Sequence, residues 1–369
     1  MQKKAKYILD IGSSSLRLLA VTHVSGKPYI FAEDSVLYDG FMDGEFLTPS
    51  ELDNDLSNLI RSMSEKMGQK IDKITVGVPA EFCLCVCKRI TRKFLPQHKI
   101  TSDDISNLFD ANSDFGDSVN YTLINYSPMQ YLLDDDVKTM SPVGKRSCGL
   151  TLDASYILAR KTLIELFGEK LTSLGVKNVD FVCAPLGQAV YCGEMNQITT
   201  PFAVVDVGHI TTSVCILKGE GLALLSSFSM GGGHISSDLM QVLKLSFKDA
   251  ELIKRKIILT VESDRNESYE ACSKGSIVKA PINLTNQVVK SRVEMIAKVI
   301  GDILKLDNVY EGINVYLTGD GLSHFKGARG IIKDITGLEI KEFKNQFDNS
   351  SNKYQTSLQG LAMMTDMLV

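Results

Sequence analysis

One pattern occurs twice in this chain of 369 residues: a β-forming run, Asp-x-Gly, hydroxyl side chains and a second apolar run. The first copy is ILDIGSSSLRLLA, residues 8–20, and the second is FAVVDVGHITTSVCIL, residues 202–217. Glycine allows a tight turn between two β-forming runs, so each copy predicts an antiparallel β-hairpin. Two such hairpins, far apart in a chain long enough for two domains, favour an α/β protein in which they face each other across a cleft.

The predicted hairpin tips carry groups that hold phosphate and metal. Backbone N–H groups and the hydroxyls of Ser13, Ser14 and Ser15 suit an anion, and Asp10 is placed to hold hydrated Mg²⁺. Taken alone, Gly-Ser-Ser-Ser is better explained as an ordinary turn with Asp10 as its capping residue. The recurrence of the pattern at Asp206 changes the balance, and the repeat predicts phosphate binding by paired hairpins.

Composition excludes some functions. The net charge of −4 is spread along the chain, and no segment is basic enough to indicate nucleic-acid binding. MQKKAK leads directly into the first hairpin, so we expect no signal peptide, and no apolar run of 18 residues predicts a membrane span. Cys83, Cys85 and Cys87 alternate along one strand face. A metal site is one interpretation, but core packing in a reducing cytoplasm is the expectation.

The segment TPSELDNDLSNLIRSMSEKMG, residues 48–68, predicts the clearest helix. Thr48 as N-cap, Pro49 at the first helical position and Glu51 form an expected capping box. Leu52, Leu56, Leu59, Ile60, Met63 and Met67 form an apolar stripe that packs on a sheet, and residues 73–79 predict the next strand. Residues 82–160 change to short alternating strands with one helix from Ser102, which indicates a small α/β insertion.

Three further segments suit a nucleotide cleft. Glu251 and Lys254 share a helical face and could hydrogen-bond ribose hydroxyls, although a surface ion pair explains them as well. VYLTGDGLS, residues 315–323, is a buried strand ending in glycines that let a base or phosphate approach the backbone, as would a plain strand-to-helix turn. Residues 231–233 are glycines before a helix that we expect Ser236 or Ser237 to cap, another possible phosphate site.

The order of LDIGSSSLR, VVDVGHITTS, SMGGGHISSDL, AELIK and LTGDG resembles that of the actin, Hsp70 and sugar-kinase superfamily. Within it the chain resembles the FtsA family of actin-like bacterial cell-division proteins. The similarity includes LYDGFMDGEFLTPSELDNDLSNLI, SPMQYLLDDDVKTMSPVGKRSCGLTL and VVKSRVEMIAKVIGDIL, the last carrying Arg292 and Glu294. It implies an α/β, actin-like ATPase fold, with two lobes around a nucleotide cleft and an inserted small subdomain of the FtsA type.

The resemblance also implies ATP and Mg²⁺ as cofactors and assigns residues to them. Asp10 and Asp206 would organise Mg²⁺ through water, and Gln188 is a candidate for positioning water. The implied nucleotide contacts are Gly12, Ser13, Ser14, Arg17, Gly208, His209, Thr211, Thr212, Gly231, Gly232, Glu251, Lys254, Gly319 and Gly321.

The second hairpin departs from the family pattern Asp-Ile-Gly-Gly-Gly-Thr-Thr-Asp. His209 and Ile210 replace glycines and Ser213 replaces a carboxylate, so we expect at most slow ATP hydrolysis. His209 could donate to a phosphate or fill the cleft. FtsA proteins also continue into an amphipathic, membrane-binding helix, whereas this chain stops at GLAMMTDMLV. We therefore expect membrane contact through a missing tail or a partner, or none.

Three functions follow as expectations. The first is an FtsA-like cytoskeletal adaptor that binds ATP, forms actin-like protofilaments and links the tubulin-like FtsZ and other division proteins to the inner face of the cell membrane. The second is an adaptor for another envelope machine, like the PilM protein of type IV pili, which binds a peptide from a membrane partner in the inserted subdomain. The third is a sugar or acid kinase.

The expected domain organisation alternates between the two lobes. The first lobe comprises residues 1–81 and 163–199, interrupted by the inserted subdomain at 82–162. The second lobe comprises residues 200–240 and 307–369, interrupted by a small subdomain at 241–306.

Overall fold

The computed structural model describes residues 5–24, 27–115, 120–134, 136–261, 263, 267–305, 312–343 and 356–367. The last two residues of the GLAMMTDMLV segment lie outside this set. None of the helices in these ranges combines the length and the apolar composition that crossing a membrane requires.

Two five-stranded sheets share one strand order. The first runs β11 (Asn178–Cys183), β6 (Lys73–Val78), β1 (Lys6–Ile11), β2 (Ser15–Val24) and β3 (Lys27–Leu37). The second runs β18 (Ile340–Glu342), β17 (Asn314–Thr318), β12 (Phe202–Val207), β13 (Thr212–Lys218) and β14 (Gly221–Phe228). In both, the central strand pairs antiparallel with the next strand in the chain and parallel with a distant one. The predicted hairpins, β1–β2 (hairpin 1) and β12–β13 (hairpin 2), are therefore at equivalent positions in two lobes.

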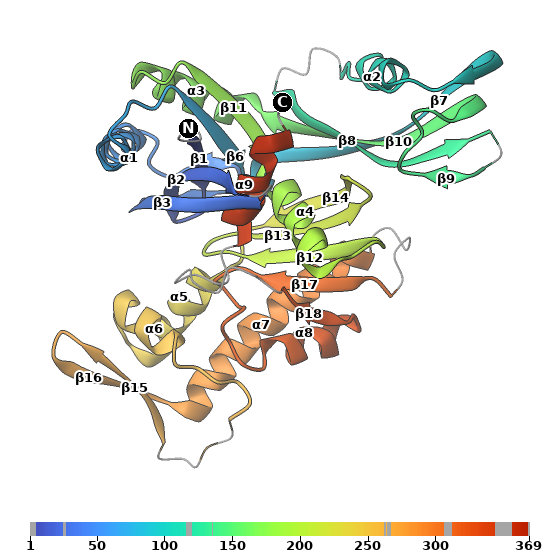
Figure 1. Ribbon diagram of the computed structural model, residues 1–369. Coiled ribbons are helices and arrows are strands. Elements are labelled where there is room, and N and C mark those ends of the chain that lie inside the picture. The colour runs from blue at the N-terminus through green and yellow to red at the C-terminus, as the bar shows by residue number, and fades with distance from the viewer. Residues whose placement is uncertain are drawn as a thin grey trace.

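Helices cover the sheets and separate them. Helices α1 (Leu52–Met67) and α3 (Lys161–Ser173) pack on the outer face of the first sheet. Helices α5 (Gly232–Leu243), α6 (Phe247–Lys254), α7 (Ile282–Lys305) and α8 (Ala328–Thr336) belong to the second lobe, where they share its core. Helices α4 (Ala184–Asn196) and α9 (Thr356–Met367) lie between the two sheets, where their apolar side chains meet those of both (Figure 1).

Two glycines set the crossing of α4 and α9. A Cβ on Gly187 would lie 2.7 Å from the Gly360 carbonyl oxygen, and one on Gly360 would lie 2.4 Å from the Gln188 nitrogen. The helices therefore touch backbone to backbone, at a distance that no larger residue permits. This contact joins the lobes at the base of the cleft.

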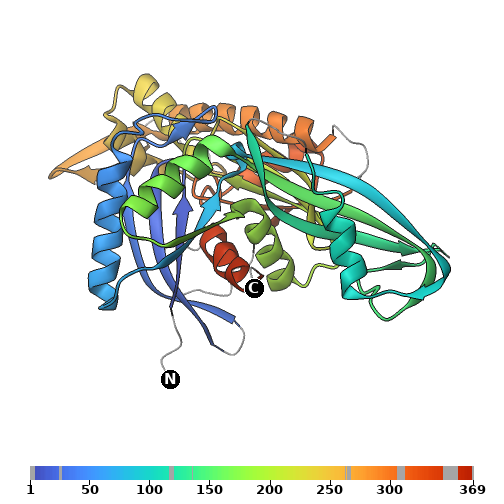
Figure 2. The same ribbon diagram turned by 90° about the horizontal axis from the view of Figure 1, so that it is seen from above.

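The inserted subdomain has its own four-stranded sheet, ordered β7 (Cys83–Lys99), β10 (Arg146–Arg160), β8 (Tyr121–Leu133) and β9 (Lys138–Thr139), with helix α2 (Ser102–Asp110) beside it. It extends away from the first sheet (Figures 1 and 2). The Ser155 hydroxyl and the Cys85 thiol both donate to the Leu222 carbonyl of β14, at 2.6 and 3.2 Å. The subdomain thus rests against the second lobe.

The three alternating cysteines meet the core only partly. Cys83 and Cys85 are half-buried against the apolar cluster between the lobes, whereas Cys87 is exposed, so the expectation of core packing is wrong for Cys87. Among the described residues, no group of three or more His, Cys, Asp or Glu is arranged to hold a metal ion.

Shorter elements complete the fold. Strands β4 (Phe41–Met42) and β5 (Glu45–Phe46) form a small hairpin, and a 3₁₀ turn (Ala80–Phe82) follows β6. Strands β15 (Ser268–Ser273) and β16 (Ser276–Pro281) pair at the far end of the second lobe (Figure 1).

Two predicted helix starts are wrong. Helix α1 begins at Leu52 with Glu51 as its N-cap and no side-chain cap, because the Glu51 amide bonds the Thr48 carbonyl in a separate turn. The apolar stripe of α1 is nevertheless confirmed, with Leu52, Leu56, Leu59 and Met63 buried. Helix α5 begins at Gly232, so Ser236 and Ser237 lie inside it instead of capping it.

Candidate functional site

The turns of hairpin 1 and hairpin 2 have the same backbone geometry. The Gly12 amide donates to the Ser15 carbonyl at 3.0 Å, and the Gly208 amide donates to the Thr211 carbonyl at 2.9 Å. A Cβ on either glycine would lie about as close to those carbonyls, at 3.0 and 2.9 Å, so each tight turn needs glycine. The repeated sequence pattern thus folds into a repeated structure.

A cavity of about 120 Å³ lies between the two hairpins and is called the hairpin cavity here. Asp10 and Asp206 both line it, together with Gln188 of α4 and the 3₁₀ turn after β6. Among the described residues, its lining includes three acids, Asp10, Asp206 and Glu81, and no lysine, arginine or histidine. An acidic cavity between two tight turns is suited to a cation.

Burial shifts the titration of both hairpin aspartates. It raises the pKa of Asp10, an effect that the nearby Arg17 guanidinium partly offsets. Burial also raises the pKa of Asp206 to about 6, with a hydrogen bond from Gln188 acting in the opposite direction. Each carboxylate therefore carries its charge at a cost that a bound cation would relieve.

Gln188 orients Asp206. Its amide nitrogen donates to Asp206 Oδ2 at 2.6 Å and to the Thr356 hydroxyl of α9 at 2.9 Å. The side chain is almost fully buried, so these bonds hold it in one position. Its amide hydrogens are used to fix an acid and not to hold a water.

The two hairpins touch each other directly. The Ile210 amide of hairpin 2 donates to the Ser13 hydroxyl of hairpin 1 at 3.0 Å. The Ile210 side chain reaches Gly40 of the first lobe, where a Cβ would stand 3.3 Å from Ile210 Cδ1 and only 2.0 Å from the Ser13 carbonyl oxygen. The lobes are thus closed at the hairpin tips by protein contacts.

Three glycine segments meet behind hairpin 2. The Gly232 amide donates to the Gly208 carbonyl at 2.9 Å, and the Gly321 amide donates to the Val207 carbonyl at 2.7 Å. A Cβ on Gly231 would lie 2.5 Å from Gly208 O, and one on Gly232 would lie 2.7 Å from Gly321 Cα. These glycines are required for backbone packing around the hairpin.

Gly319 is placed next to the site acid itself. It adopts a positive φ of 90°, and a Cβ there would lie 2.3 Å from Asp206 Oδ1. Glycine at this position therefore leaves room for the carboxylate.

The Glu251–Lys254 pair is joined to the glycine segments. Lys254 Nζ bonds Glu251 Oε1 at 2.6 Å and the Gly232 carbonyl at 3.0 Å, and the Ser236 hydroxyl bonds the same carboxylate oxygen. Lys254 is buried, so the interpretation of Glu251 and Lys254 as a surface ion pair is wrong. The pair fixes the start of α5.

His209 lies beside that pair. A Cβ on Gly233 would meet the His209 ring at 2.7 Å, and the ring contacts Phe247 edge-on with centroids 6.2 Å apart. Burial and the Lys254 charge lower the pKa of His209. The imidazole therefore occupies space beside the predicted ribose contacts, as a neutral group at pH 7.

The remaining predicted residues divide into two groups. Ser13 and Thr211 line the hairpin cavity, whereas the Thr212 hydroxyl donates a hydrogen bond to the Met230 carbonyl at 2.5 Å. Arg17 pairs opposite Asp10 on β2, and Ser14 lies in the turn with its carbonyl bonded to the Tyr38 amide at 3.3 Å. Neither Ser14 nor Arg17 lines the cavity.

The residues of the cavity fit Mg²⁺ held through water. Two carboxylates with raised pKa values line a small cavity, and the described residues contain no cluster that would ligate a metal ion directly. The amides of Gly12 and Gly208 are already bonded within their own turns, so a phosphate would have to bind other amides of the turns. Because Ser13 already accepts the Ile210 hydrogen bond, a phosphate between the hairpins would have to replace that contact.

Sequence reasoning missed Glu81. It follows β6, the parallel neighbour of β1, and lines the hairpin cavity with Asp10. The available signal was its position directly after a buried strand, because the carboxyl ends of parallel strands meet at one edge of a sheet.

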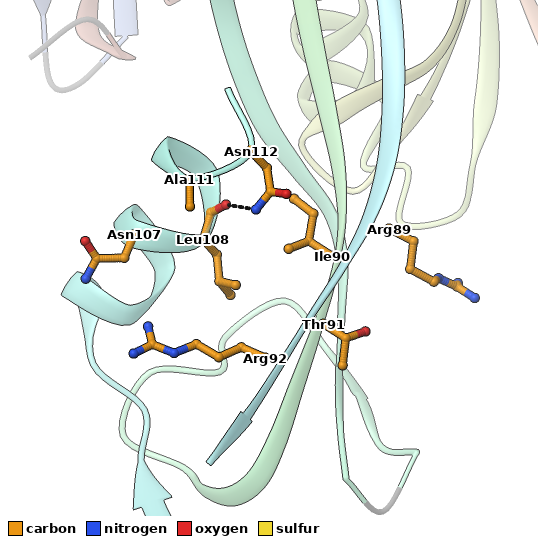
Figure 3. Close-up of a pocket in the computed structure, with 8 residues that line it drawn as sticks. All are labelled: Arg89, Ile90, Thr91, Arg92, Asn107, Leu108, Ala111 and Asn112. Atoms are coloured by element: carbon orange, nitrogen blue, oxygen red, sulfur yellow. Dashed lines mark hydrogen bonds between the residues drawn. The ribbon is translucent and has the colours of Figure 1, made fainter. Parts of the chain in front are cut away.

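A second hollow, of about 500 Å³, lies in the inserted subdomain between β7 and α2. Figure 3 shows Ile90 and Leu108 on its two walls, with Arg92 extending beneath α2 and Arg89 pointing away on the other side of β7. Arg92 Nη1 forms an ion pair with Asp104 Oδ1 at 3.4 Å. Arg89 donates two hydrogen bonds to the Asp153 carboxylate, from Nε at 2.7 Å and from Nη2 at 3.0 Å.

Comparison with known proteins relates the sequence to one family. A family model described as "Cell division protein FtsA" matches residues 203–360. The FtsA of Enterococcus faecalis is 21% identical over 348 residues, covering 92% of this chain and 79% of that protein. The FtsA of Bacillus subtilis is 17% identical over 345 residues, covering 90% of this chain and 77% of its own length. The chain is a divergent FtsA-like protein.

Solved structures show that the FtsA-like chain has the fold of actin-like ATPases. The PilM–PilN type IV pilus biogenesis complex matches with a TM-score of 0.65 and 15% identity, covering 97% of this chain and 98% of that one. The ADP-bound MreB5 of Spiroplasma citri matches with a TM-score of 0.57 and 12% identity, covering 100% and 98%. The expected fold class is confirmed, and the sequence relatives that the chain resembles are cell-division proteins.

Proposed function

We propose that this protein is a cytoskeletal adaptor of bacterial cell division. It binds ATP with Mg²⁺ between its lobes, assembles into actin-like protofilaments, and links a tubulin-like FtsZ and other division proteins to the cytoplasmic face of the membrane. One observation carries the nucleotide part of this proposal: two equivalent hairpins place Asp10 and Asp206 on one acidic cavity. The FtsA relatives support the division part.

Each residue set has a distinct part in the proposed site. The hairpin turns at Gly12 and Gly208 offer close backbone approach to phosphates, and the two aspartates hold the hydrated cation that neutralises them. Glu251, which is partly exposed beside the buried Lys254, is the member of that pair that would contact the ribose. Nucleotide would then act as a switch, since a phosphate between the hairpins would replace the Ser13–Ile210 contact and bias the closure of the lobes.

Asp10→Ala tests the site. We expect the wild-type chain to bind ATP only with Mg²⁺, and Asp10→Ala to lose that binding because one of the two cation-holding carboxylates is gone. Calorimetry with and without Mg²⁺ measures both. Asp180→Ala is the matched control, since Asp180 pairs with Lys73 on the surface at 2.7 Å. Mg²⁺-dependent binding that survives in Asp10→Ala contradicts the proposed site.

Assembly tests the second part of the proposal. We expect pelleting of filaments with ATP and Mg²⁺, and co-pelleting of FtsZ. Equal pelleting with and without nucleotide, in wild type and Asp10→Ala alike, would favour a scaffold that is indifferent to nucleotide.

A PilM-like adaptor is a second candidate, favoured by the 500 Å³ hollow in the inserted subdomain and the likeness to the PilM–PilN complex. In this function a peptide from a membrane partner would bind the subdomain. Asn107→Arg, at an exposed position on the hollow, should weaken binding of such a cytoplasmic peptide in an anisotropy titration. Unchanged affinity would place the peptide elsewhere.

A further inference from the structure

The hairpin cavity contains one acid that neither hairpin supplies. Glu81 follows β6 in the 3₁₀ turn, and its Oε1 accepts a hydrogen bond from the Gly44 amide in the β4–β5 turn. Its other oxygen, Oε2, is buried and has no hydrogen-bond partner among the described residues. Half of this carboxylate is anchored, and the other half is unused.

An unused buried carboxylate oxygen is costly. Burying a polar atom without a partner costs about 1–3 kcal/mol, and more for a charged group. Asp10 and Asp206 share the cavity with Glu81, so the cost rises with every acid that is ionised. Such groups persist in native proteins mainly where a function requires them.

Glu81 is held firmly in place. Arg160 donates to the Gly44 carbonyl at 3.3 Å, and a Cβ on Gly44 would lie 2.2 Å from Arg160 Nη1. The Gly44 amide in turn fixes Glu81 Oε1. Oε2 is buried while the hairpin tips are closed, so it can reach a water molecule only when a ligand displaces the Ser13–Ile210 contact and widens the cavity. In that state a fixed carboxylate with one unpartnered oxygen is suited to accept a proton from the water.

Gln188 is not available for that task. Its amide hydrogens are bonded to Asp206 and Thr356, and the two hairpin aspartates are the groups suited to the cation. Among the described residues of the cavity lining, Glu81 is the remaining acid.

We propose that Glu81 is the general base for ATP hydrolysis in this cleft, an inference that rests on the proposed nucleotide function. Glu81 Oε2 accepts a proton from water as the water oxygen forms a bond to the terminal phosphorus. The bond from that phosphorus to the bridging oxygen breaks, and its electron pair stays on ADP. The proton then passes from Glu81 to solvent, leaving ADP and phosphate as products.

Glu81→Gln tests the assignment in the full chain, because glutamine keeps an oxygen for the Gly44 amide but is not a base. Glu45→Gln is the control, an exposed acid in β5 beside the same turn. We expect Mg²⁺–ADP and Mg²⁺–ATP affinities within twofold of wild type for both variants by calorimetry. Binding of ADP with aluminium fluoride, which mimics the phosphoryl group in transfer, should weaken at least tenfold in Glu81→Gln alone. Single-turnover hydrolysis should fall about 100-fold.

The outcomes separate this inference from the proposed function. If wild type binds ATP and Glu81→Gln matches it in both analogue binding and hydrolysis, the assignment of Glu81 is overturned while the nucleotide site stands. The same holds if wild type binds ATP but gains no affinity from aluminium fluoride. If wild type binds no nucleotide, both fall. Glu81→Asp, which keeps the charge on a shorter side chain, should regain part of the lost rate.

Discussion

Burial of Asp206 makes the charged form of its side chain costly to the stability of the folded protein. Asp206 lies at the end of a buried strand, and its pKa of about 6 reflects that burial, with Asp10 and Asp320 adding repulsion and Arg17 partly compensating. The folded state binds the carboxyl proton of Asp206 more tightly than the unfolded state does. The contribution of protonated Asp206 to the free energy of unfolding is therefore fully present below about pH 4. It is lost as the pH rises through about 6.

Asp206→Asn should therefore stabilise the protein at neutral pH. The difference between a pKa of 3.8 and one of about 6 corresponds to an upper limit of about 3 kcal/mol. We expect Asp206→Asn to exceed wild type in free energy of unfolding at pH 7.5 by up to that amount, and to match it near pH 4. Urea denaturation with EDTA present measures this. A difference of the same size at both pH values would mean that the ionisation of Asp206 is not its cause.

Residues of the site differ in how far the sequence could predict them. Asp10 and Asp206 were predicted because the hairpin that carries each of them is a local pattern. Glu81 was missed because parallel pairing of β1 with β6, more than sixty residues apart along the chain, brings it to the cavity. The Ser13–Ile210 contact joins two lobes and has no local signal at all.

At the scale of elements, the crossing of α4 and α9 depends on Gly187 and Gly360. Because the backbones of the two helices touch, the apolar side chains of the helices can pack closely against the apolar side chains of both sheets. Any side chain at these positions must push the helices apart.

Gly360→Ala should destabilise the fold, because the added Cβ would lie 2.4 Å from the Gln188 nitrogen. Overpacking of this kind costs about 1–3 kcal/mol. Gly168→Ala in α3 is the matched control: nothing lies within 4 Å of its Cβ, and alanine favours a helix by about 1 kcal/mol over glycine. Thermal unfolding should thus move in opposite directions for the two variants. A rise in midpoint for Gly360→Ala would show that the helices separate freely.

Elements were predicted well in type and less well at their starts. The apolar stripe of α1 was predicted correctly. The start of the helix was not, because a backbone turn from Thr48 to Glu51 precedes it and no side chain caps it. In α5, the low helix propensity of glycine favoured a helix that starts after Gly231–Gly233, with Ser236 or Ser237 as its cap. The Gly232 and Gly233 amides instead bond the Gly208 and His209 carbonyls of hairpin 2, so tertiary contacts override propensity.

At the scale of the whole molecule, two lobes whose sheets share one strand order are joined at the base of the cleft, at the hairpin tips and through the inserted subdomain. The α4–α9 crossing joins them at the base, and the Ser13–Ile210 hydrogen bond joins them at the hairpin tips. The Ser13–Ile210 hydrogen bond, worth about 1 kcal/mol, is accompanied by the Ile210 side chain near Gly40 and by a hydrogen bond from the Ser229 hydroxyl to Asp43 Oδ1 at 2.7 Å. It is the contact that a cleft ligand would have to displace.

Ser13→Ala should loosen the tips without unfolding the lobes. We expect the Ile210 amide to exchange with deuterium about fivefold faster, which corresponds to a loss of about 1 kcal/mol. Ser14→Ala, in the same turn, is the control and should leave that amide unchanged. Equal exchange in Ser13→Ala and wild type would mean that the lobes are held together by other contacts.

The placement of the inserted subdomain has an evolutionary consequence. Its strands pair only with one another, and the chain enters it after Phe82 and leaves it at Lys161, so neither five-stranded sheet shares a strand with it. Its described contacts with the second lobe lie along β13 and β14: Lys218 pairs with Asp153 at 3.6 Å, the Glu220 amide donates to the Pro128 carbonyl at 3.0 Å, and the Leu222 carbonyl accepts from Ser155 and Cys85. Mutations on the part of the subdomain surface that lies away from these contacts and from Arg160, which bonds the Gly44 carbonyl, can therefore accumulate without disturbing the cleft. The surface of the subdomain can then change between lineages while the two lobes are inherited unchanged.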